Sequence, residues 1–318
     1  MGHSKTFRAI EVGDGGDGRW GEYARSRWPE LSWWLDPERR TPEHAARGRA
    51  LFAAHMPELV GVRERLAAQL DRPDGDTFLT FANMRTSFAG CTQTGGAGRL
   101  LRNYDFAPER CEGTVVHSRF LRPVIGTQEA GWGLLDGMND AGLAVSLTFG
   151  GRSVHGPGFA VPLVVRYLLE TCATVAEALG RLRTIPISTA QNLTLADPRG
   201  AVTVYAGPDI PLTEAPDACA ANHQTAPVPE GQERFSRTGE RLARVRATGA
   251  DVAAMLRPPL YMTAYDEGLG TLYTADYRPA EGRVTHHWPG ERWEQSFDGF
   301  TTGSRTVALG TVGRVPLR

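Results

Sequence analysis

The sequence is poor in several residue types that mark particular protein classes. One of its 318 residues is lysine, Lys5, so arginine supplies 34 of the 35 cationic side chains, which we attribute to codon bias in a GC-rich genome. The four cysteines include no CxxC spacing, so neither a disulfide framework nor a zinc site is indicated. The formal net charge of -1 gives no reason to expect a nucleic acid partner.

Long apolar runs are also missing. No stretch approaches the roughly 18 consecutive apolar residues of a membrane span, and the first residues lack the apolar segment of a secretory signal. We therefore expect no membrane partner and a cytoplasmic location. A hydrophobic content of 41% and a length of 318 residues suffice to bury a core without disulfides, in one large domain or two small ones.

Residues 1–90 are predicted to form a helical segment after a loop-like opening, where GDGGDG occupies positions 13–18. Thr41 suits the N-cap position of a helix, and good helix formers fill residues 45–70 with an interruption at Pro57. Four of the seven tryptophans lie in this segment. A short segment so rich in aromatic residues is expected to pack against a larger body.

From residue 78 onward, short apolar or alternating runs separated by Gly, Asn and Asp predict strands, the first over residues 78–85. A turn signal at residues 197–200 predicts an antiparallel hairpin, and a second hairpin is expected to join residues 271–277 to 283–288. Helices are predicted at residues 162–182 and around 237–246. Strands grouped on both sides of a helical block predict a layered α+β fold with antiparallel sheets.

A glycine directly before a cysteine is the sharpest local feature, in Phe88-Ala89-Gly90-Cys91-Thr92. Glycine permits an unusual backbone conformation just before the thiol. A hairpin returning from Cys91 could bring Arg102 and Asp105 alongside the sulfur, where a cation favours thiolate and a carboxylate can hold an amine. Because cysteine is among the most buried residue types, a purely structural position for Cys91 is the alternative interpretation.

Seven motifs in collinear order resemble the N-terminal-nucleophile (Ntn) hydrolases of the acyl-CoA:6-aminopenicillanic acid acyltransferase branch, peptidase family C45, which are related to choloylglycine hydrolases. The motifs are Gly-Cys-Thr at 90–92, GRLLRNYDF at 98–106, GMNDAGLAVSLTFGG at 137–151, AQNLTLAD at 190–197, AANHQT at 220–225, FSRTGERL at 235–242 and TLYTADYRPAEGRV at 271–284. The resemblance implies a four-layer αββα sandwich of antiparallel sheets, with the helical N-terminal segment attached.

The resemblance also implies that the precursor cleaves itself between Gly90 and Cys91. Residues 1–90 would then be a small propeptide-derived chain and residues 91–318 the catalytic chain beginning at Cys91, the two staying together as a heterodimer in one globule. An α-amine with a pKa near ~7.7–8.0 is a well-matched base for a thiol near ~8.5, so Cys91 would supply both nucleophile and base. No cofactor and no metal are implied, and no HExxH motif occurs.

Residue roles follow from the matching motifs. The resemblance implies that Arg102 flanks the thiol, that Asp105 hydrogen-bonds the new amine and that Asn192 donates a hydrogen bond to the oxyanion. Asn139 matches a possible substrate or oxyanion contact, but Asn139-Asp140-Ala141-Gly142 also has the composition of a turn.

Two further matches leave alternatives open. Arg237 follows Ser236 as in the choloylglycine branch and is a tentative substrate-binding residue; the acyltransferase branch would place arginine at position 239, which is glycine here. Asn222-His223 matches the family's Asn-His motif, either close to the site or as a structural pair.

The sequence thus predicts a self-processing amidase or N-acyltransferase that forms an acyl-Cys91 intermediate from a small-molecule linear amide or acyl thioester. Hydrolysis and acyl transfer share that intermediate, and the motifs around Cys91 leave the choice open. A binding or assembly protein that never matures on the same scaffold is the alternative from another class. A Ser-His-Asp hydrolase is disfavoured because no GxSxG motif occurs.

Overall fold

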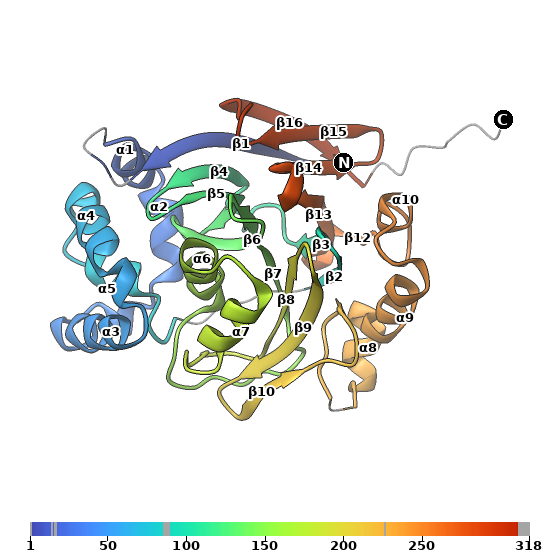
Figure 1. Cartoon of the computed structure of the whole chain (residues 1–318), viewed down its shortest axis with the longest axis horizontal. Helices are drawn as coiled ribbons and strands as arrows, with labels where there is room; N and C mark the ends of the chain where they lie inside the picture. The colour runs from blue at the N-terminus through green and yellow to red at the C-terminus, as the bar shows by residue number, and fades with distance from the viewer. Residues whose placement is uncertain (1, 14, 16–17, 85–89, 226, 311–318) are drawn as a thin grey trace.

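Two stacked β-sheets form the centre of the molecule, and helices cover the outer face of each (Figure 1). The structure is a computed structural model and describes residues 2–13, 15, 18–84, 90–225 and 227–310. Among the described strands, every pairing is antiparallel except that of β1 with β4. The predicted α+β fold with antiparallel sheets is confirmed.

The nine-stranded sheet has the order β10 (Ile210–Glu214), β9 (Gly200–Gly207), β8 (Gln191–Asp197), β7 (Ala144–Phe149), β6 (Gly133–Asn139), β5 (Pro123–Glu129), β4 (Thr114–Arg119), β1 (His3–Gly13) and β16 (Gly303–Leu309). The seven-stranded sheet has the order β11 (Cys219–Ala220), β2 (Gly90–Gly96), β3 (Arg99–Phe106), β13 (Leu269–Arg278), β14 (Arg283–Trp288) and β15 (Glu291–Ser296), with β12 (Thr263–Ala264) also paired to β13.

The α-helices are α1 (Arg19–Ser26), α2 (Trp28–Leu31), α3 (Pro42–His55), α4 (Val60–Leu70), α5 (Gly75–Thr80), α6 (Val161–Thr171), α7 (Val175–Leu182), α8 (Glu230–Ser236), α9 (Thr238–Thr248) and α10 (Val252–Met255). Short 3-10 helices are η1 (Ser32–Trp34), η2 (Pro37–Arg39), η3 (Pro57–Leu59), η4 (Tyr265–Glu267) and η5 (Pro279–Glu281). Helices α6 and α7 lie on the nine-stranded sheet, whereas α9 and α10 lie on the seven-stranded one. No helix of the described residues has the length and apolar character needed to cross a bilayer.

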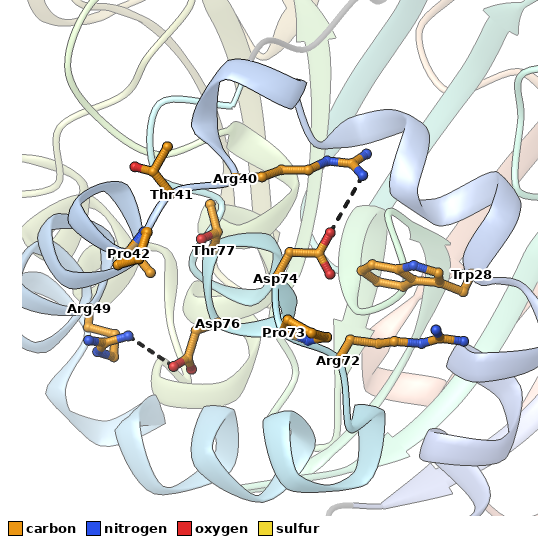
Figure 2. A pocket seen from close by; sticks show the side chains of 11 residues that line it. Trp28, Arg40, Thr41, Pro42, Arg49, Arg72, Pro73, Asp74, Asp76 and Thr77 are labelled. Atoms are coloured by element: carbon orange, nitrogen blue, oxygen red, sulfur yellow. Dashed lines mark hydrogen bonds and ion pairs between the residues drawn. The ribbon is translucent and has the colours of Figure 1, made fainter.

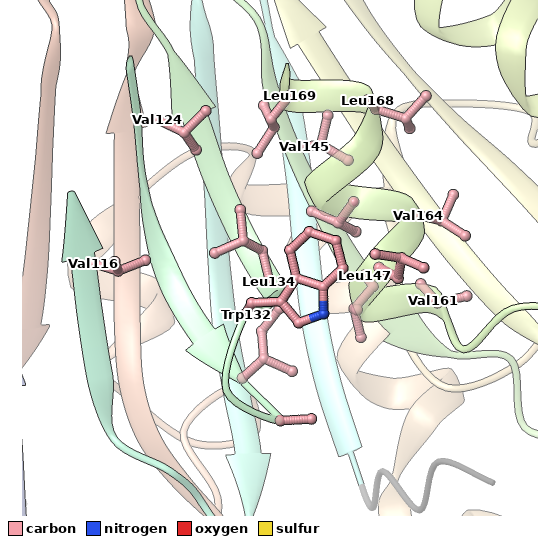
Figure 3. Packing of buried hydrophobic residues seen from close by; sticks show 14 of the residues in the cluster. Val116, Val124, Trp132, Leu134, Val145, Leu147, Val161, Val164, Leu168 and Leu169 are labelled. Carbon is pink, nitrogen blue, oxygen red and sulfur yellow. The ribbon is translucent and has the colours of Figure 1, made fainter. Parts of the chain in front are cut away.

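Helix α6 packs its apolar side chains against the nine-stranded sheet around Trp132 (Figure 3). The indole of Trp132 is fully buried, and its ring lies 6.3 Å from that of Phe52 in α3, 6.4 Å from Phe81 and 6.4 Å from Phe120. Because Phe52 and Phe81 belong to the N-terminal segment, one tryptophan joins that segment to the sheet. The aromatic segment therefore packs against a larger body, as predicted.

Several local predictions are confirmed. The Thr41 side chain accepts a hydrogen bond from the backbone N–H of His44 and caps α3, and η3 begins at Pro57, where the helical run was expected to break. In the predicted hairpin of β8 and β9, Asp197 pairs with Gly200. The second hairpin is formed by β13 and β14.

Other local predictions are wrong. Residues 78–85 do not begin with a strand: Phe78 and Leu79 lie in α5, and Phe81 ends that helix with a φ of 51°. This apolar run is buried as a helix, a case that periodicity does not separate from a buried strand. Residues 85–89, which include Phe88 and Ala89 of the motif before Cys91, lie outside the described residues.

Two further differences concern element boundaries. The helix predicted over residues 162–182 is two helices, α6 and α7, because Thr174 caps the second by accepting a hydrogen bond from the N–H of Glu177. Residues 3–13, for which no strand was predicted, form β1, which lies inside the nine-stranded sheet between β4 and β16. Residues 1–90 are therefore not helical throughout.

Replacing Trp132 by alanine should lower the free energy of unfolding by about 3–5 kcal/mol, the usual cost of removing a buried aromatic side chain. Urea unfolding followed by circular dichroism measures this loss. Trp33→Ala is the matched control, because Trp33 is 52% exposed and its removal should change stability little. Equal losses for the two variants would contradict the central place given to Trp132.

Candidate active site

Cys91 lies near the start of β2, in a hairpin with β3. The glycine at position 98 makes the tight turn with a φ of 69°. The resulting register places Cys91 opposite Tyr104 and Gln93 opposite Arg102. The predicted hairpin returning from Cys91 therefore forms and brings Arg102 next to the thiol.

Arg102 contacts the sulfur directly. Its Nη2 donates to Cys91 Sγ at 2.9 Å, while its Nη1 donates to Asp136 Oδ2 and to the Leu135 carbonyl, both at 2.8 Å. The hydroxyls of Tyr273 and Tyr277 also donate to the Asp136 carboxylate. Because Arg102 and Asp136 are both fully buried, this ion pair fixes the guanidinium across the space between the two sheets.

The backbone nitrogen of Cys91 is held by a different side chain. It donates to Asn222 Oδ1 at 2.9 Å. The same amide oxygen accepts from Arg241 Nη2, and Asn222 Nδ2 donates to the Phe149 carbonyl at 3.2 Å. Both the sulfur and the nitrogen of Cys91 thus have a fixed polar partner.

Arg241 joins this cluster from α9. Its Nη1 donates to Asp105 Oδ2 and Thr92 Oγ1, both at 2.8 Å, and to the Cys91 carbonyl at 3.1 Å. Asp105 Oδ1 accepts from Thr271 Oγ1 at 2.7 Å. The Asp105 carboxylate therefore bonds to Arg241 and Thr271, and it reaches the Cys91 backbone through Arg241.

Burial and charge oppose each other at the thiol. Burial raises the pKa of the Cys91 thiol, and the Arg102 guanidinium acts in the opposite direction by favouring thiolate. Burial likewise raises the pKa of the Asp105 carboxyl, which Arg241 counteracts. The Cys91 side chain is fully buried, so the thiol is closed to solvent in the intact chain.

Gly90 is sterically confined at the bond before the cysteine. A Cβ at this position would overlap Leu269 Cδ1, and Asn222 Oδ1 and Asp105 Cβ would each lie 3.4 Å from it. Glycine therefore lets the backbone at position 90 lie close to Leu269, Asn222 and Asp105.

Asn192 lies near the cluster in a supporting position. Its Nδ2 donates to Thr148 Oγ1 at 3.1 Å and to the carbonyls of Ala221 at 2.8 Å and His223 at 3.2 Å, on either side of Asn222. The amide donor expected for an oxyanion is thus engaged by these acceptors. The structure shows Asn192 holding the loop that carries Asn222.

Asn139 and Arg237 are not brought to Cys91. Asn139 uses its full hydrogen-bonding capacity in a turn: Oδ1 accepts from the N–H groups of Ala141 and Leu143, and Nδ2 donates to the carbonyls of Leu169 and Cys172. This geometry favours the turn interpretation.

Arg237 has a φ of 50° at the start of α9 and forms a surface ion pair with Glu240 at 2.7 Å. Among the described residues, no side-chain hydrogen bond or ion pair joins Arg237 to the cluster around Cys91, and its assignment as a substrate-binding residue stays a prediction.

Arg241 is a member of the cluster that the sequence motifs did not single out, and Asn222 is one for which they left two interpretations open. In the acyltransferase branch, an arginine is expected three residues after a serine. Counted from Ser236 that position is Gly239, but Thr238 and Arg241 show the same spacing with threonine in place of serine. Thr238 also supports Asn222, because its hydroxyl accepts from the Asn222 backbone N–H at 2.6 Å. The spacing from Thr238 was thus a usable signal for Arg241.

Two other features of the structure bear on the cluster around Cys91: the arrangement of metal-binding side chains and a cavity in the N-terminal segment. Within the part of the chain that the structure describes, no group of three or more His, Cys, Asp or Glu side chains is arranged to hold a metal ion. A cavity of about 680 Å³ lies between α3 and the start of α5, where Arg40 pairs with Asp74 and Arg49 with Asp76 (Figure 2). None of the residues that line it belongs to the cluster around Cys91.

A family model described as acyl-coenzyme A:6-aminopenicillanic acid acyl-transferase matches residues 91–293, more than half of the chain. The chain belongs to this acyltransferase family. The match begins at Cys91 itself, and it confirms the resemblance to the acyl-CoA:6-aminopenicillanic acid acyltransferase branch that the motifs indicated. No curated protein sequence matches this family member.

Three solved structures are similar to this acyltransferase family member at 14% sequence identity. A mutant of the conjugated bile acid hydrolase of Clostridium perfringens aligns over 68% of this chain and 96% of its own, with a TM-score of 0.42. Penicillin V acylase from Agrobacterium tumefaciens aligns over 68% and 90%, with a TM-score of 0.43. The N-acylethanolamine-hydrolyzing acid amidase ortholog of Caenorhabditis elegans aligns over 69% and 99%, with a TM-score of 0.45.

Two arginines four residues apart give a matched test of the cluster. Arg241→Gln should lower the free energy of unfolding by about 3–5 kcal/mol, because it leaves the buried Asp105 carboxylate without its cation. Arg237→Gln should change it by less than about 0.5 kcal/mol, since the Arg237–Glu240 pair is exposed. Chemical unfolding of both variants measures the difference. Similar values would mean that the Arg241–Asp105 pair does not organise this region.

Proposed function

We propose that this protein is a self-processing Ntn amidohydrolase or N-acyltransferase that uses Cys91 as its nucleophile. One observation carries the proposal: buried side chains hold both reactive atoms of Cys91, with Arg102 at the sulfur and Asn222 at the nitrogen. A cysteine that serves only as a small core residue has no use for two such partners. The family match that starts at Cys91 supports the same assignment.

In the proposed maturation, the Cys91 sulfur attacks the carbonyl carbon of Gly90. A carbon–sulfur bond forms, the Gly90–Cys91 peptide bond breaks, and the thiol proton ends on the Cys91 nitrogen as that atom becomes an amine. Water then hydrolyses the thioester, which returns the thiol and leaves Gly90 with a new carboxylate. Arg102 stabilises the thiolate that begins the sequence, and Asn222 fixes the position of the nitrogen.

In the proposed catalytic cycle, the free α-amine of Cys91 takes the thiol proton while the sulfur attacks a substrate carbonyl. This forms an acyl-Cys91 intermediate and releases an amine from a linear amide, or a thiol from an acyl thioester. Water or an amine then accepts the acyl group. Arg241 supports the cycle from outside the reacting atoms, because it holds the Cys91 carbonyl, Asp105 and Asn222 together.

The proposal includes two chains that stay together, residues 1–90 and 91–318. Strand β1, in the small chain, pairs with both β4 and β16 of the large one. Phe52 and Phe81 of the small chain also pack on Trp132. A cytoplasmic location and a small-molecule amide or acyl thioester substrate remain predictions.

Purified wild-type protein should show two fragments of about 10 and about 25 kDa, which is the 34.6 kDa mass divided after Gly90. Cys91→Ala should remain one chain and lack turnover, because alanine has no nucleophile. Mass spectrometry of the intact proteins and amide hydrolysis assays measure both effects. Cys111→Ala is the control, because Cys111 is a buried cysteine outside the cluster, and it should still be processed.

Cleavage at another bond, or processing and turnover by Cys91→Ala, would disprove the assignment of the nucleophile. Co-elution of the two fragments on a sizing column is the expected result for chains that share one sheet. Fragments that separate without denaturant would contradict the proposed heterodimer.

Asn222→Ala should lower kcat by about a hundredfold, because a nucleophile that loses its fixed orientation reacts far more slowly. Asn139→Ala serves as the control, since the hydrogen bonds of Asn139 all lie within its turn and the adjoining end of α6. The control should lower the melting temperature while its kcat per folded molecule stays near that of wild type. Steady-state kinetics on processed protein, with thermal unfolding, distinguish the two. A normal kcat for Asn222→Ala would remove Asn222 from the proposed mechanism.

A further inference from the structure

A second cavity, of about 280 Å³, lies beside η1 and the ends of β4 and β5. It is at the lower end of the volumes typical of small-molecule sites. Its walls combine two tryptophans with several charged side chains. The lining residues are Arg27, Pro29, Glu30, Leu31, Trp33, Trp34, Glu109, Arg110, Cys111, Glu112 and Glu129.

Glu129 gives this cavity an unsatisfied acceptor. The residue ends β5 and is 1% exposed, and its Oε2 has no hydrogen-bond partner among the described residues. A buried carboxyl oxygen without a donor costs free energy, so a ligand that supplies a donor would be favoured there. Burial raises the pKa of the Glu129 carboxyl, and the nearby Glu112 carboxylate adds to this effect.

Both carboxylate oxygens of the neighbouring Glu112 accept hydrogen bonds from the protein. Its carboxylate accepts from the Tyr23 hydroxyl, from Gln128 Nε2 at 2.7 Å and from the Gly131 backbone N–H at 2.9 Å. Two acids thus lie side by side in one cavity wall. Glu129 also accepts from the backbone N–H groups of Glu112 and Ala130, but its Oε2 keeps no partner among the described residues. The difference identifies Glu129 as the group that is available to a ligand.

Charge and aromatic content favour a cation over a neutral donor. Four acidic side chains line the cavity against two guanidinium groups, and the Lys5 ammonium, which is not among the lining residues, also acts on Glu129. Both guanidiniums have partners: Arg27 is paired with Glu30, and Arg110 lies 5.7 Å above the Trp33 ring. Indole faces attract ammonium ions, and Trp33 and Trp34 both border the cavity.

Tyr104 is acted on by charges of both the cavity and the cluster around Cys91. This residue pairs with Cys91 across the β2–β3 hairpin, and its hydroxyl also lacks a hydrogen-bond partner among the described residues. Burial raises the pKa of the Tyr104 phenol, and the charges of Glu129, Cys111 and Cys91 raise it further. One side chain therefore lies within electrostatic reach of the acid in the cavity and of the nucleophile.

We propose that this cavity binds a small primary ammonium ion, with Glu129 as its buried counter-ion and the two tryptophans as aromatic walls. The ammonium nitrogen would donate to Glu129 Oε2. Only the further identification of this ion with the amine part of the substrate rests on the function proposed above. On that view, the site selects amides or acceptors whose amine portion carries a positive charge.

Isothermal titration with benzylammonium chloride tests the site, and benzyl alcohol serves as the neutral analogue of similar shape. Wild-type protein should bind benzylammonium at least about tenfold more tightly than benzyl alcohol, and Glu129→Gln should abolish that preference. Glu214→Gln is the matched control, because Glu214 is an exposed acid on β10 at the other end of the same sheet, and it should bind like wild type.

A second variant keeps the test independent of any folding defect in Glu129→Gln. Trp33→Ala removes a half-exposed ring and should weaken benzylammonium binding severalfold without unfolding the protein. No preference for the cation in wild type, or an unchanged preference in Glu129→Gln, would overturn the proposal.

Titration of Cys91→Ala separates this proposal from the proposed function. Benzylammonium binding by this variant is expected, since the cavity does not include Cys91. Binding in a wild-type protein that shows no Cys91-dependent turnover would leave the cavity assignment in place and reject the enzyme. Cys91-dependent turnover without selective binding of benzylammonium would support the enzyme and reject the cavity assignment.

Discussion

The ion pair between Arg241 and Asp105 is the interaction on which the arrangement around Cys91 depends. Both side chains are fully buried, and the pair ties α9 to the β2–β3 hairpin. The same guanidinium bonds to the Cys91 carbonyl and to Asn222. Two buried charges carry a large desolvation penalty, which only good geometry and further hydrogen bonds offset. A second buried pair, Arg102 with Asp136, fixes the other side of the cysteine and spans the two sheets.

The features that sequence predicted well are those set by local chemistry. The hairpin of β8 and β9 is determined by the four turn residues 197–200. The N-cap of α3 is determined by the hydroxyl of Thr41 alone. The proximity of Cys91 and Arg102 also follows from a short hairpin, because a tight turn leaves one register available. Family membership was readable because its motifs occur in order along the chain.

The features that sequence missed depend on distant partners. Strand β1 has no hairpin partner and is recognisable only through β4 and β16, which lie more than a hundred residues away. Helix α5 has only six residues, and all of them except Asp76 are buried, so it is too short and too evenly buried to show the helical periodicity that would mark it. Asn222 matches the family's Asn-His motif, but no local pattern decides between a place beside Cys91 and a structural role, because its position depends on loop packing.

The position of β1 inside the sheet also bears on the order in which the chain can fold during synthesis. His3 pairs with Leu309, so β1 is synthesised about three hundred residues before β16, the strand that covers its second side. Until then β1 is an open edge strand, which is a template for unwanted pairing between chains. The strand that finally covers it, β16, exposes Ser304 and Thr306 and becomes a polar edge. Strand β16 therefore covers the open side of β1 and also protects the sheet from association with other copies.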